Sequence, residues 1–340
     1  MARKYKGVAR RPAKQNQYII LILYAALILS IAGYIFSGSV LVGIFAFFVL
    51  VVTLAMEFKY SVKEEGLKKS IYDIFAAIAI IAVLWIILIA ALGTYEPVDV
   101  VASCSMLPTM QRGDLVLLHG IPNMTSFLKD NHIPVVNVSA ATMNATLQNM
   151  DSEFLAYFAH AVGNNSDIGE SFATGGLPIG LYNTKCIDEL EAQGLFGRIG
   201  TCEVQSQKGN LIKYYYSVQN ESVGGNMEQI AQTSSIAING TMINENYSNP
   251  IIVYRTTGND SFSGDIIHRV VAAIHAGSNY YILTKGDNNG GLDIQFVNYP
   301  ETSSQVVGYV VGSVPYLGYL KLIVSGMFAT PAGCNSTILR

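Results

Sequence analysis

Charge is scarce in this 340-residue sequence, because only 13% of its residues are Asp, Glu, Lys or Arg. No charged residue occurs between Lys14 and Glu57, and none occurs between Asp73 and Glu96. A membrane-spanning helix needs about 20 consecutive apolar residues. A single cleaved secretory signal, with an apolar core of about 7–15 residues, is therefore excluded. The uncharged stretches predict three transmembrane helices, at Tyr18–Phe36, Val40–Met56 and Ile74–Leu92.

Acidic residues are absent from the first 17 positions, which hold six basic ones: Arg3, Lys4, Lys6, Arg10, Arg11 and Lys14. The segment between the second and third predicted helices holds four more: Lys59, Lys63, Lys68 and Lys69. Basic residues that flank membrane helices stay on the cytoplasmic side. The tail and this loop are therefore expected inside, and everything after residue 93 outside. No basic surface interleaved with aromatic residues follows, so nucleic acid is not an expected partner.

Acceptor sites for N-glycosylation are absent before residue 100 and frequent after it. Their asparagines are Asn123, Asn137, Asn144, Asn164, Asn220, Asn239, Asn246, Asn259 and Asn335. Such Asn-x-Ser/Thr motifs belong on external surface loops. Their one-sided distribution agrees with the orientation inferred from the basic residues.

Cysteine is also rare, with four residues, no Cys-x-x-Cys motif and no His/Cys spacing of a zinc site, so a zinc site is not expected. Cys186 and Cys202 can pair in an oxidising exterior, although spacing alone does not decide connectivity. We expect Cys104 and Cys334 to be unpaired.

The sequence after the third helix is typical of a mostly β protein. Short aliphatic runs at 100–102 and 114–119 predict strands around a polar turn, and runs at 251–255, 265–275, 280–287 and 305–320 predict more strands. Segment 121–249, rich in Asn, Ser, Thr and Gly, separates the two groups and predicts an α+β or irregular external insertion, with helices at Ala140–Ala161 and Asp188–Ala192 and a strand at Leu211–Val218. We expect Tyr316–Ala329 to be a core strand leading into an interfacial segment, with a fourth membrane span as the alternative.

The predicted fold class is thus a membrane-anchored, mostly β protein. Its expected parts are a basic cytoplasmic tail at 1–17, two transmembrane helices at 18–56, a basic cytoplasmic loop at 57–73, a third transmembrane helix at 74–93, a split β domain at 94–120 and 250–320, the insertion at 121–249, and a C-terminal interfacial segment and tail at 321–340.

The polar turn SCSMLPTMQRGD, residues 103–114, is a candidate nucleophile site. A serine hydroxyl needs a general base and an oxyanion donor to act as a nucleophile. His268, within the strand-like GDIIHRVV, is the better candidate base, and His275 is the alternative, at an odd spacing that places it on the other face. The loop KGDNNGGLD offers Asp287 and Asp293 as carboxylates to orient the histidine.

These blocks resemble those of the type I signal peptidases, in their archaeal and endoplasmic-reticulum form. SCSMLPTMQRGD is similar to the block that holds the nucleophile, so the resemblance implies Ser105 as nucleophile and Ser103 as an oxyanion-hole donor. GDIIHRVV is similar to the block with the histidine base, which implies His268. LTKGDNN with an aspartate six residues later implies Asp293 as the triad carboxylate and Asp287 as a supporting one. VVGYVVGSVPYLGYL is similar to the terminal strand and turn of the family.

The resemblance covers about a third of the chain, at 75–118 and 250–320. It implies a membrane-bound serine endopeptidase that removes signal peptides from secreted preproteins through a Ser-His-Asp acyl-enzyme mechanism, without a cofactor. The split β domain is then the catalytic domain. The implied location is the cell membrane, multi-pass, with this domain on the extracytoplasmic side. Implied partners are preproteins with A-x-A-like cleavage sites, the lipid bilayer and, as a candidate, the secretion translocon.

Three features depart from the family pattern: the first two helices are extra, the insertion is long, and Cys104 stands between the two serines. Two other functions remain open on the sequence. One is a non-catalytic membrane-anchored glycoprotein with a recognition ectodomain, and the other is a serine protease of the same fold with a regulatory substrate.

Overall fold

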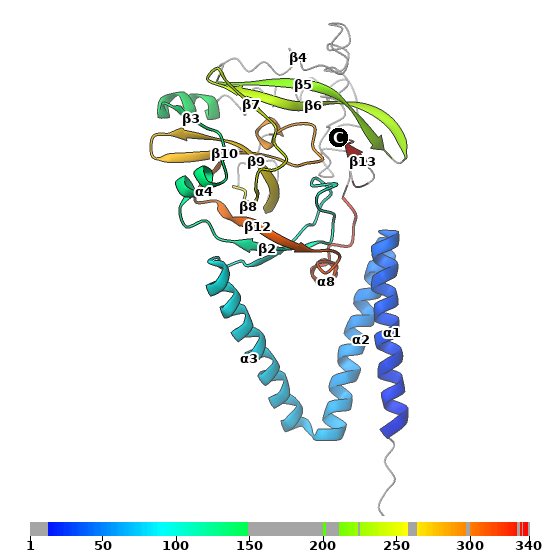
Figure 1. The fold of residues 1–340 in the computed structure, drawn as a ribbon. Helices are drawn as coiled ribbons and strands as arrows, with labels where there is room; N and C mark the ends of the chain where they lie inside the picture. The colour runs from blue at the N-terminus through cyan, green and yellow to red at the C-terminus, as the bar shows by residue number, and fades with distance from the viewer. Residues whose placement is uncertain are drawn as a thin grey trace, which may run out of the picture. The chain divides into compact units, whose positions relative to one another are not determined.

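The computed structural model describes residues 13–148, 200–201, 211–223, 225–257, 264–296, 300–331, 334 and 336–338. Three helices begin the described chain: α1 (Ala13–Ser37), α2 (Val40–Glu65) and α3 (Leu67–Leu92). All three are long and apolar enough to cross a membrane. A helix satisfies its own backbone hydrogen bonds, which is what the interior of a bilayer requires. The three predicted spans are therefore confirmed as helices, and the rest of the described chain is mostly β (Figure 1).

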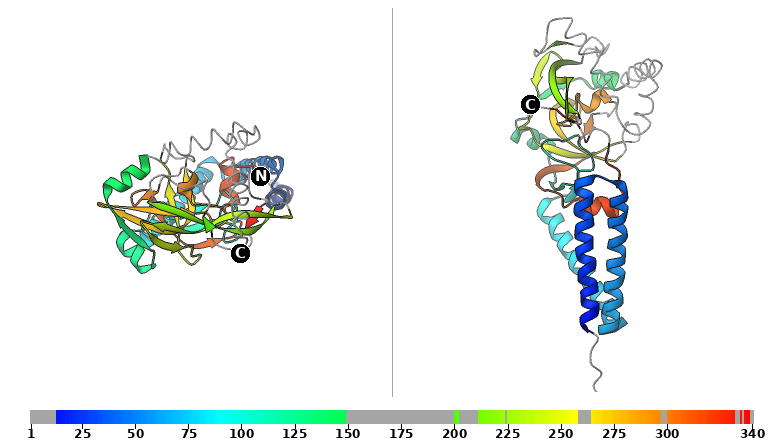
Figure 2. Two further views of the ribbon diagram at one scale, coloured as in Figure 1. Left: turned by 90° about the horizontal axis from the view of Figure 1, so that it is seen from above. Right: turned by 90° about the vertical axis from the view of Figure 1, so that its right-hand side faces the viewer.

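The chain divides into two compact units. The first contains the residues up to Ile87 together with Tyr319–Thr330, and the second contains Leu88–Gly318 together with the residues from Pro331 onward. In the first unit α1 and α2 pack side by side and join at a tight turn (Figures 1 and 2). The Tyr34 hydroxyl donates to the carbonyl oxygens of Met327 (3.1 Å) and Phe328 (2.9 Å), so the segment after α8 (Tyr319–Val324) is fastened to this hairpin.

The expectation of a core strand at Tyr316–Ala329 is wrong, because residues 319–324 form α8 instead. Tyr319, Leu322 and Ile323 are the buried residues of α8, and they follow the i, i+3, i+4 spacing of one helix face. That spacing in the sequence indicates a helix, although the run is also apolar enough to resemble a strand. A six-residue helix is far too short to cross a bilayer, so a fourth span is excluded for this helix.

The larger sheet of the second unit has eight strands. Its main path is β1 (Val98–Val100), β2 (Leu115–His119), β12 (Val306–Val314), β8 (Ile251–Arg255), β9 (Asp265–Ala276), β10 (Asn279–Lys285) and β11 (Glu301–Thr302), all antiparallel. The parallel strand β3 (Val135–Val138) pairs with β9 beyond the end of β8. A short helix, α4 (Met124–Asp130), lies between β2 and β3 in the sequence.

The second sheet has five strands and is built mainly from segment 200–244. Its path is β13 (Ser336–Ile338), β5 (Ile212–Val223), β6 (Asn226–Ile238) and β7 (Thr241–Asn244), and β4 (Gly200–Thr201) also pairs with β5. The long β5–β6 hairpin lies over β9 and β10 in Figure 1, and Figure 2 shows from above that it extends across this unit.

The two sheets share one hydrophobic core. Ile236 and Ile238 of β6 are buried in the same cluster as Ala272 and Ile274 of β9 and Leu283 of β10. Burial of apolar side chains is the main favourable term in folding. The described part of segment 121–249 thus covers one face of the β9–β10 strands, so their side chains are buried on both faces.

Most strand predictions are confirmed, with boundary shifts. The runs at 251–255, 265–275 and 280–287 correspond to β8, β9 and β10, and the run at 211–218 begins β5. The strand expected at 100–102 is β1 at 98–100, two residues earlier. Residues 140–148 are helical, as expected, whereas the rest of the helix predicted to residue 161 and the one at 188–192 lie outside the described residues.

We expect Ile236→Ala to lower the free energy of unfolding by about 2–5 kcal/mol, because it removes a fully buried side chain from the core between the sheets. The measurement is urea unfolding in detergent, followed by circular dichroism. Met242→Ala, at a side chain that is 53% exposed on the neighbouring strand, is the matched control and should change stability by less than about 0.5 kcal/mol. Equal effects of the two variants would contradict the shared core.

Candidate active site

Ser105 lies in the irregular segment that joins β1 to β2. Two backbone bonds close the base of this loop, from Val101 N to Asp114 O (2.9 Å) and from Gly113 N to Val101 O (2.8 Å). Met106 and Met110 are 1% and 6% exposed, and they are buried in one hydrophobic cluster with residues of β2, β8 and β9. The loop is therefore anchored at its base and by two apolar side chains, which holds Ser105 in a defined place. We refer to residues 101–114 as the serine loop.

His268 lies on β9 and contacts both other residues of the predicted triad. Its Nε2 is 2.9 Å from Ser105 Oγ, and its Nδ1 is 2.6 Å from Asp293 Oδ2. Asp293 begins the short helix η2 (Asp293–Phe296). With the ring proton on Nδ1, the imidazole donates to the carboxylate and turns the Nε2 lone pair toward the serine hydroxyl. Three residues from distant parts of the sequence thus form one hydrogen-bonded chain.

Asp293 Oδ2 accepts two further hydrogen bonds. The Tyr254 hydroxyl donates at 2.7 Å and the Thr284 hydroxyl at 2.6 Å. His268 and Asp293 are only 6% and 4% exposed, so these bonds lie in a region of low dielectric constant. Burial, and then the negative charge of Asp293, raise the pKa of Tyr254 well above its ordinary 10.0. Tyr254 is therefore a neutral donor that fixes the orientation of the carboxylate.

Tyr254 and Thr284 cannot be recognised as site residues from the sequence alone, and strand pairing explains why. Ile252 pairs with His268 across β8 and β9, so Tyr254, two residues further along β8, faces the same side of the sheet. Thr284 pairs with Val270 across β10 and β9, and reaches that side as well. Each is a single polar residue in an otherwise apolar run. Only the register between strands shows that both point at Asp293.

The backbone at Gly286 passes close to both Ser105 and His268. A Cβ at this position would lie 2.8 Å from His268 Nε2, 2.8 Å from Ser105 O and 2.7 Å from Asn289 Nδ2. Real side chains do not occupy such positions without displacing their neighbours. Glycine is therefore required for the loop after β10 to pass this close to the serine and the histidine.

The Asp287 carboxylate forms a buried ion pair and is not exposed to water as in an ordinary surface turn. Arg269 Nε donates to Asp287 Oδ1 (2.8 Å) and Nη2 donates to Oδ2 (2.7 Å), while the Thr109 hydroxyl also donates to Oδ2. Arg269 Nη1 donates to Asn249 O at 2.6 Å. A bidentate pair of this kind gives geometric specificity. Asp287 thus connects the loop after β10 to strand β9 and to the serine loop.

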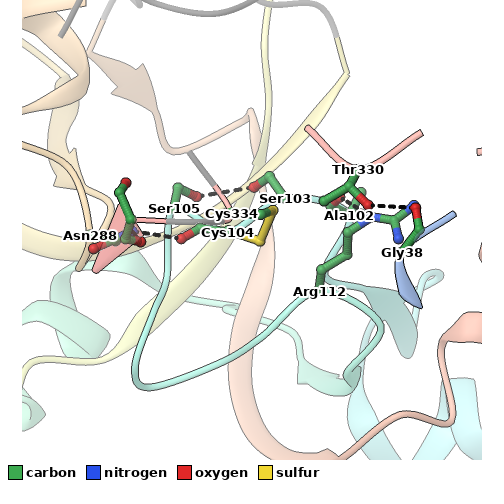
Figure 3. The surroundings of a disulfide bond; sticks show 10 residues. Gly38, Ala102, Ser103, Cys104, Ser105, Arg112, Asn288, Thr330 and Cys334 are labelled. Atoms are coloured by element: carbon green, nitrogen blue, oxygen red, sulfur yellow. Dashed lines mark hydrogen bonds between the residues drawn. A yellow bond between two sulfur atoms is a disulfide. The ribbon is translucent and has the colours of Figure 1, made fainter. Parts of the chain in front are cut away.

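Ser103 lies beside Ser105, whereas the alternative base His275 lies far from it. The Ser103 Oγ lies 3.2 Å from Ser105 Oγ, and Figure 3 shows the two side chains on either side of Cys104. His275 lies seven residues beyond His268 on β9, about 23 Å away along an extended strand. Its ring stacks on Tyr280 and its Nδ1 is 2.9 Å from Asn137 Oδ1. The structure therefore brings His268, and not His275, to the serine.

Cys104 and Cys334 form a disulfide, so the expectation that they are unpaired is wrong (Figure 3). They are 230 residues apart in the sequence, which gave no signal of pairing. They meet because β13, which follows Cys334, pairs with β5 of the second sheet beside the serine loop. Cys186 and Cys202 lie outside the described residues.

The second sheet holds the loop that carries Asp287 and Asp293. Thr233 of β6 donates its backbone N–H to Gly290 O (2.7 Å) and its hydroxyl to Gln295 Oε1 (3.0 Å). Lys285 at the end of β10 pairs with Glu245 at 2.7 Å, with only 2% of the lysine side chain exposed. Segment 121–249 therefore contributes directly to the position of this loop. Among the described residues, no cluster of His, Cys, Asp or Glu side chains suits a metal ion.

Comparisons with known proteins give a partial match. No protein-family profile matches the chain. It is 32% identical over 108 residues to the signal peptidase complex catalytic subunit SEC11 of Colletotrichum graminicola and to that of Chaetomium globosum, and 31% identical over 107 residues to that of Candida tropicalis. Each match covers 30% of this chain. The chain spans 61% of the length of the first two relatives and 63% of the third.

Tyr254→Phe tests the buried hydroxyl at Asp293. Above pH 10 the unfolded chain loses the Tyr254 proton while the folded chain keeps it, because its folded pKa is raised. The free energy of unfolding should therefore fall as pH rises beyond this point. Tyr254→Phe should lack this fall in the free energy of unfolding, which is at most about 1.4 kcal/mol per pH unit for one proton.

The measurement is urea unfolding in detergent between pH 9 and about pH 11. Tyr95→Phe, which removes a phenol that is 87% exposed, is the control and should keep the wild-type slope. If the free energy of unfolding of Tyr254→Phe changed with pH as steeply as that of the wild type, Tyr254 would not be the buried neutral donor assigned here.

Proposed function

We propose that this protein is a membrane-bound serine endopeptidase that removes N-terminal signal peptides from secretory preproteins. The observation that carries the proposal is the hydrogen-bonded chain from Ser105 Oγ through His268 to Asp293. Partial similarity to proteins named signal peptidase complex catalytic subunit supports the same activity. A histidine between a serine hydroxyl and a carboxylate is the arrangement that activates serine for acyl transfer, whatever the fold.

In the proposed mechanism Ser105 Oγ attacks the scissile carbonyl carbon while His268 Nε2 accepts its proton. Asp293 holds the Nδ1 proton and stabilises the imidazolium that forms, without becoming protonated itself. The imidazolium then donates its Nε2 proton to the leaving amine. Water, deprotonated by His268, hydrolyses the Ser105 ester and releases the signal peptide. Tyr254 and Thr284 keep the carboxylate oriented through both steps.

Ser103 is the proposed side-chain donor to the oxyanion. Its hydroxyl lies 3.2 Å from Ser105 Oγ, close enough to reach the oxygen of a carbonyl bound to that serine. The backbone N–H of Ser105 is the proposed second donor. Donors that are already aimed at the developing negative charge lower the barrier, and loss of one costs about 10²–10³ in kcat.

The position of the serine loop fits a substrate that is still inserted in a membrane. Gly120 N, just after β2, donates to Leu92 O in the last turn of α3 (2.8 Å). The serine loop ends at Asp114, at the opposite end of β2, about 16 Å further along the strand. The proposed cleavage site lies just outside the bilayer. The proposed specificity is for small side chains one and three residues before the cut, as in A-x-A signals.

The proposed topology places the β-rich unit outside the cytoplasm. The four basic residues near the α2–α3 junction are exposed and favour the cytoplasmic side: Lys59, Lys63, Lys68 and Lys69. The six glycosylation asparagines among the described residues are also exposed, and all belong to the β-rich unit: Asn123, Asn137, Asn144, Asn220, Asn239 and Asn246. The bilayer and preproteins are the proposed partners. The secretion translocon is a further candidate partner, implied by the family resemblance alone.

Ser105→Ala should abolish cleavage of a model preprotein by protein reconstituted in liposomes, because it removes the nucleophile. Ser103→Ala should lower kcat by about 10²–10³ and leave the cut site unchanged. The measurement is the rate of product formation, with N-terminal sequencing of the product. Ser304→Ala, at an exposed serine on the turn before β12, is the control and should cleave at the wild-type rate. Undiminished cleavage by Ser105→Ala would refute the proposal.

Gly286→Ala should lower kcat about tenfold to a hundredfold, because a methyl group would displace His268 or the serine loop. Gly312→Ala on β12, where a Cβ meets no atom within 4 Å, is the matched control and should retain wild-type kcat. Circular dichroism on both variants checks that they fold. Wild-type kcat in folded Gly286→Ala would contradict the close approach.

A further inference from the structure

The Cys104–Cys334 disulfide joins the serine loop to the C-terminal strand between the two serines of the candidate site. Cys104 is flanked by Ser103 and Ser105, and its side chain is only 8% exposed. Two residues after Cys334, β13 begins and pairs with the last residues of β5, from Ser336 opposite Val223. The peptide unit next to the proposed nucleophile is therefore covalently attached to the second sheet.

Asn288 makes the same connection through hydrogen bonds. Its backbone N–H donates to Ser105 O at 2.7 Å, and its side-chain amide donates to Cys104 O at 3.2 Å. The same amide group donates to Ser336 O (2.9 Å), and its oxygen accepts from Ile338 N (2.8 Å). Figure 3 shows Asn288 beside the disulfide and Ser105. One 8% exposed side chain thus bonds the serine loop and β13 at once.

The disulfide and the Asn288 hydrogen bonds are different kinds of bond, but both join the serine loop to the C-terminal segment that contains Cys334 and β13. The disulfide fixes the Cys104 side chain, whereas Asn288 fixes the carbonyl groups of Cys104 and Ser105. Together they leave the backbone on either side of the nucleophile little freedom to rotate. The position of Ser105 Oγ against His268 Nε2, and of Ser103 Oγ against Ser105 Oγ, depends on that backbone.

We propose that the C-terminal strand β13 is a positioning element for the nucleophile, fastened to the serine loop by the Cys104–Cys334 disulfide and by Asn288, so that turnover depends on the disulfide being oxidised. This inference rests on the proposed function of Ser105. A dithiol reduces the disulfide to two thiols with the transfer of two electrons and two protons, and the dithiol itself becomes a disulfide. The Asn288 bonds then still join the serine loop to β13.

The test compares two double variants reconstituted in liposomes with a model preprotein, each with and without dithiothreitol. Cys186→Ser/Cys202→Ser retains only the disulfide of the site, whereas Cys104→Ser/Cys334→Ser lacks it. Reduction should lower kcat of the first variant and of the wild type about tenfold to a hundredfold, as expected for a misplaced nucleophile. KM should stay unchanged. The second variant should have low kcat in both conditions.

Asn288→Ala adds a second measurement that is free of reductant. Asn288 and the disulfide join the same segments, so their effects on kcat should couple. The decrease in kcat of the triple variant Cys104→Ser/Cys334→Ser/Asn288→Ala should therefore differ by more than about twofold from the product of the decreases caused by Asn288→Ala and by Cys104→Ser/Cys334→Ser. Thiol labelling confirms reduction. Unchanged kcat after complete reduction of the first variant, or independent effects of Asn288→Ala and the disulfide, would overturn the inference. Cleavage that survives Ser105→Ala would instead overturn the proposed function.

Discussion

One carboxylate oxygen, Asp293 Oδ2, is the point on which the site depends. It accepts hydrogen bonds from His268 on β9, Tyr254 on β8 and Thr284 on β10. A buried carboxylate is tolerated only when its hydrogen-bonding capacity is satisfied, so the three strands must keep the register that delivers these donors. The same register aims His268 Nε2 at Ser105. The requirement to satisfy one buried charge therefore also sets the geometry of the proposed general base.

The second sheet is part of the structure that supports this chemistry. Its apolar side chains complete the core over β9 and β10, and Thr233 bonds the loop between β10 and η2. Its edge strand β13 reaches the serine loop through Asn288 and the disulfide. A loop is positioned reliably when packed elements restrain it from several sides. Segment 121–249, an insertion in sequence terms, thus restrains the loop between β10 and η2 directly, and it restrains the serine loop through the pairing of β5 with β13.

Part of the site was predictable from local sequence, and part was not. Ser105, His268 and Asp293 stand in motifs with recognisable neighbours, so each could be named without coordinates. Tyr254 and Thr284 could not, because a polar residue in an apolar strand has a partner only once the strand register is known. The disulfide was predicted wrongly for a similar reason: its cysteines are 230 residues apart, and their meeting follows from the pairing of β13 with β5.

The sequence by itself determined the three apolar helices, most strands of the larger sheet and the identity of the proposed triad. These depend on local composition, on the alternation of side chains and on motifs within a dozen residues. The tertiary structure decided that residues 319–324 form a helix, that Asp287 pairs with Arg269, and that the C-terminal strand is joined to the serine loop. Each of these depends on contacts between distant segments, and such contacts form only when the whole chain has folded.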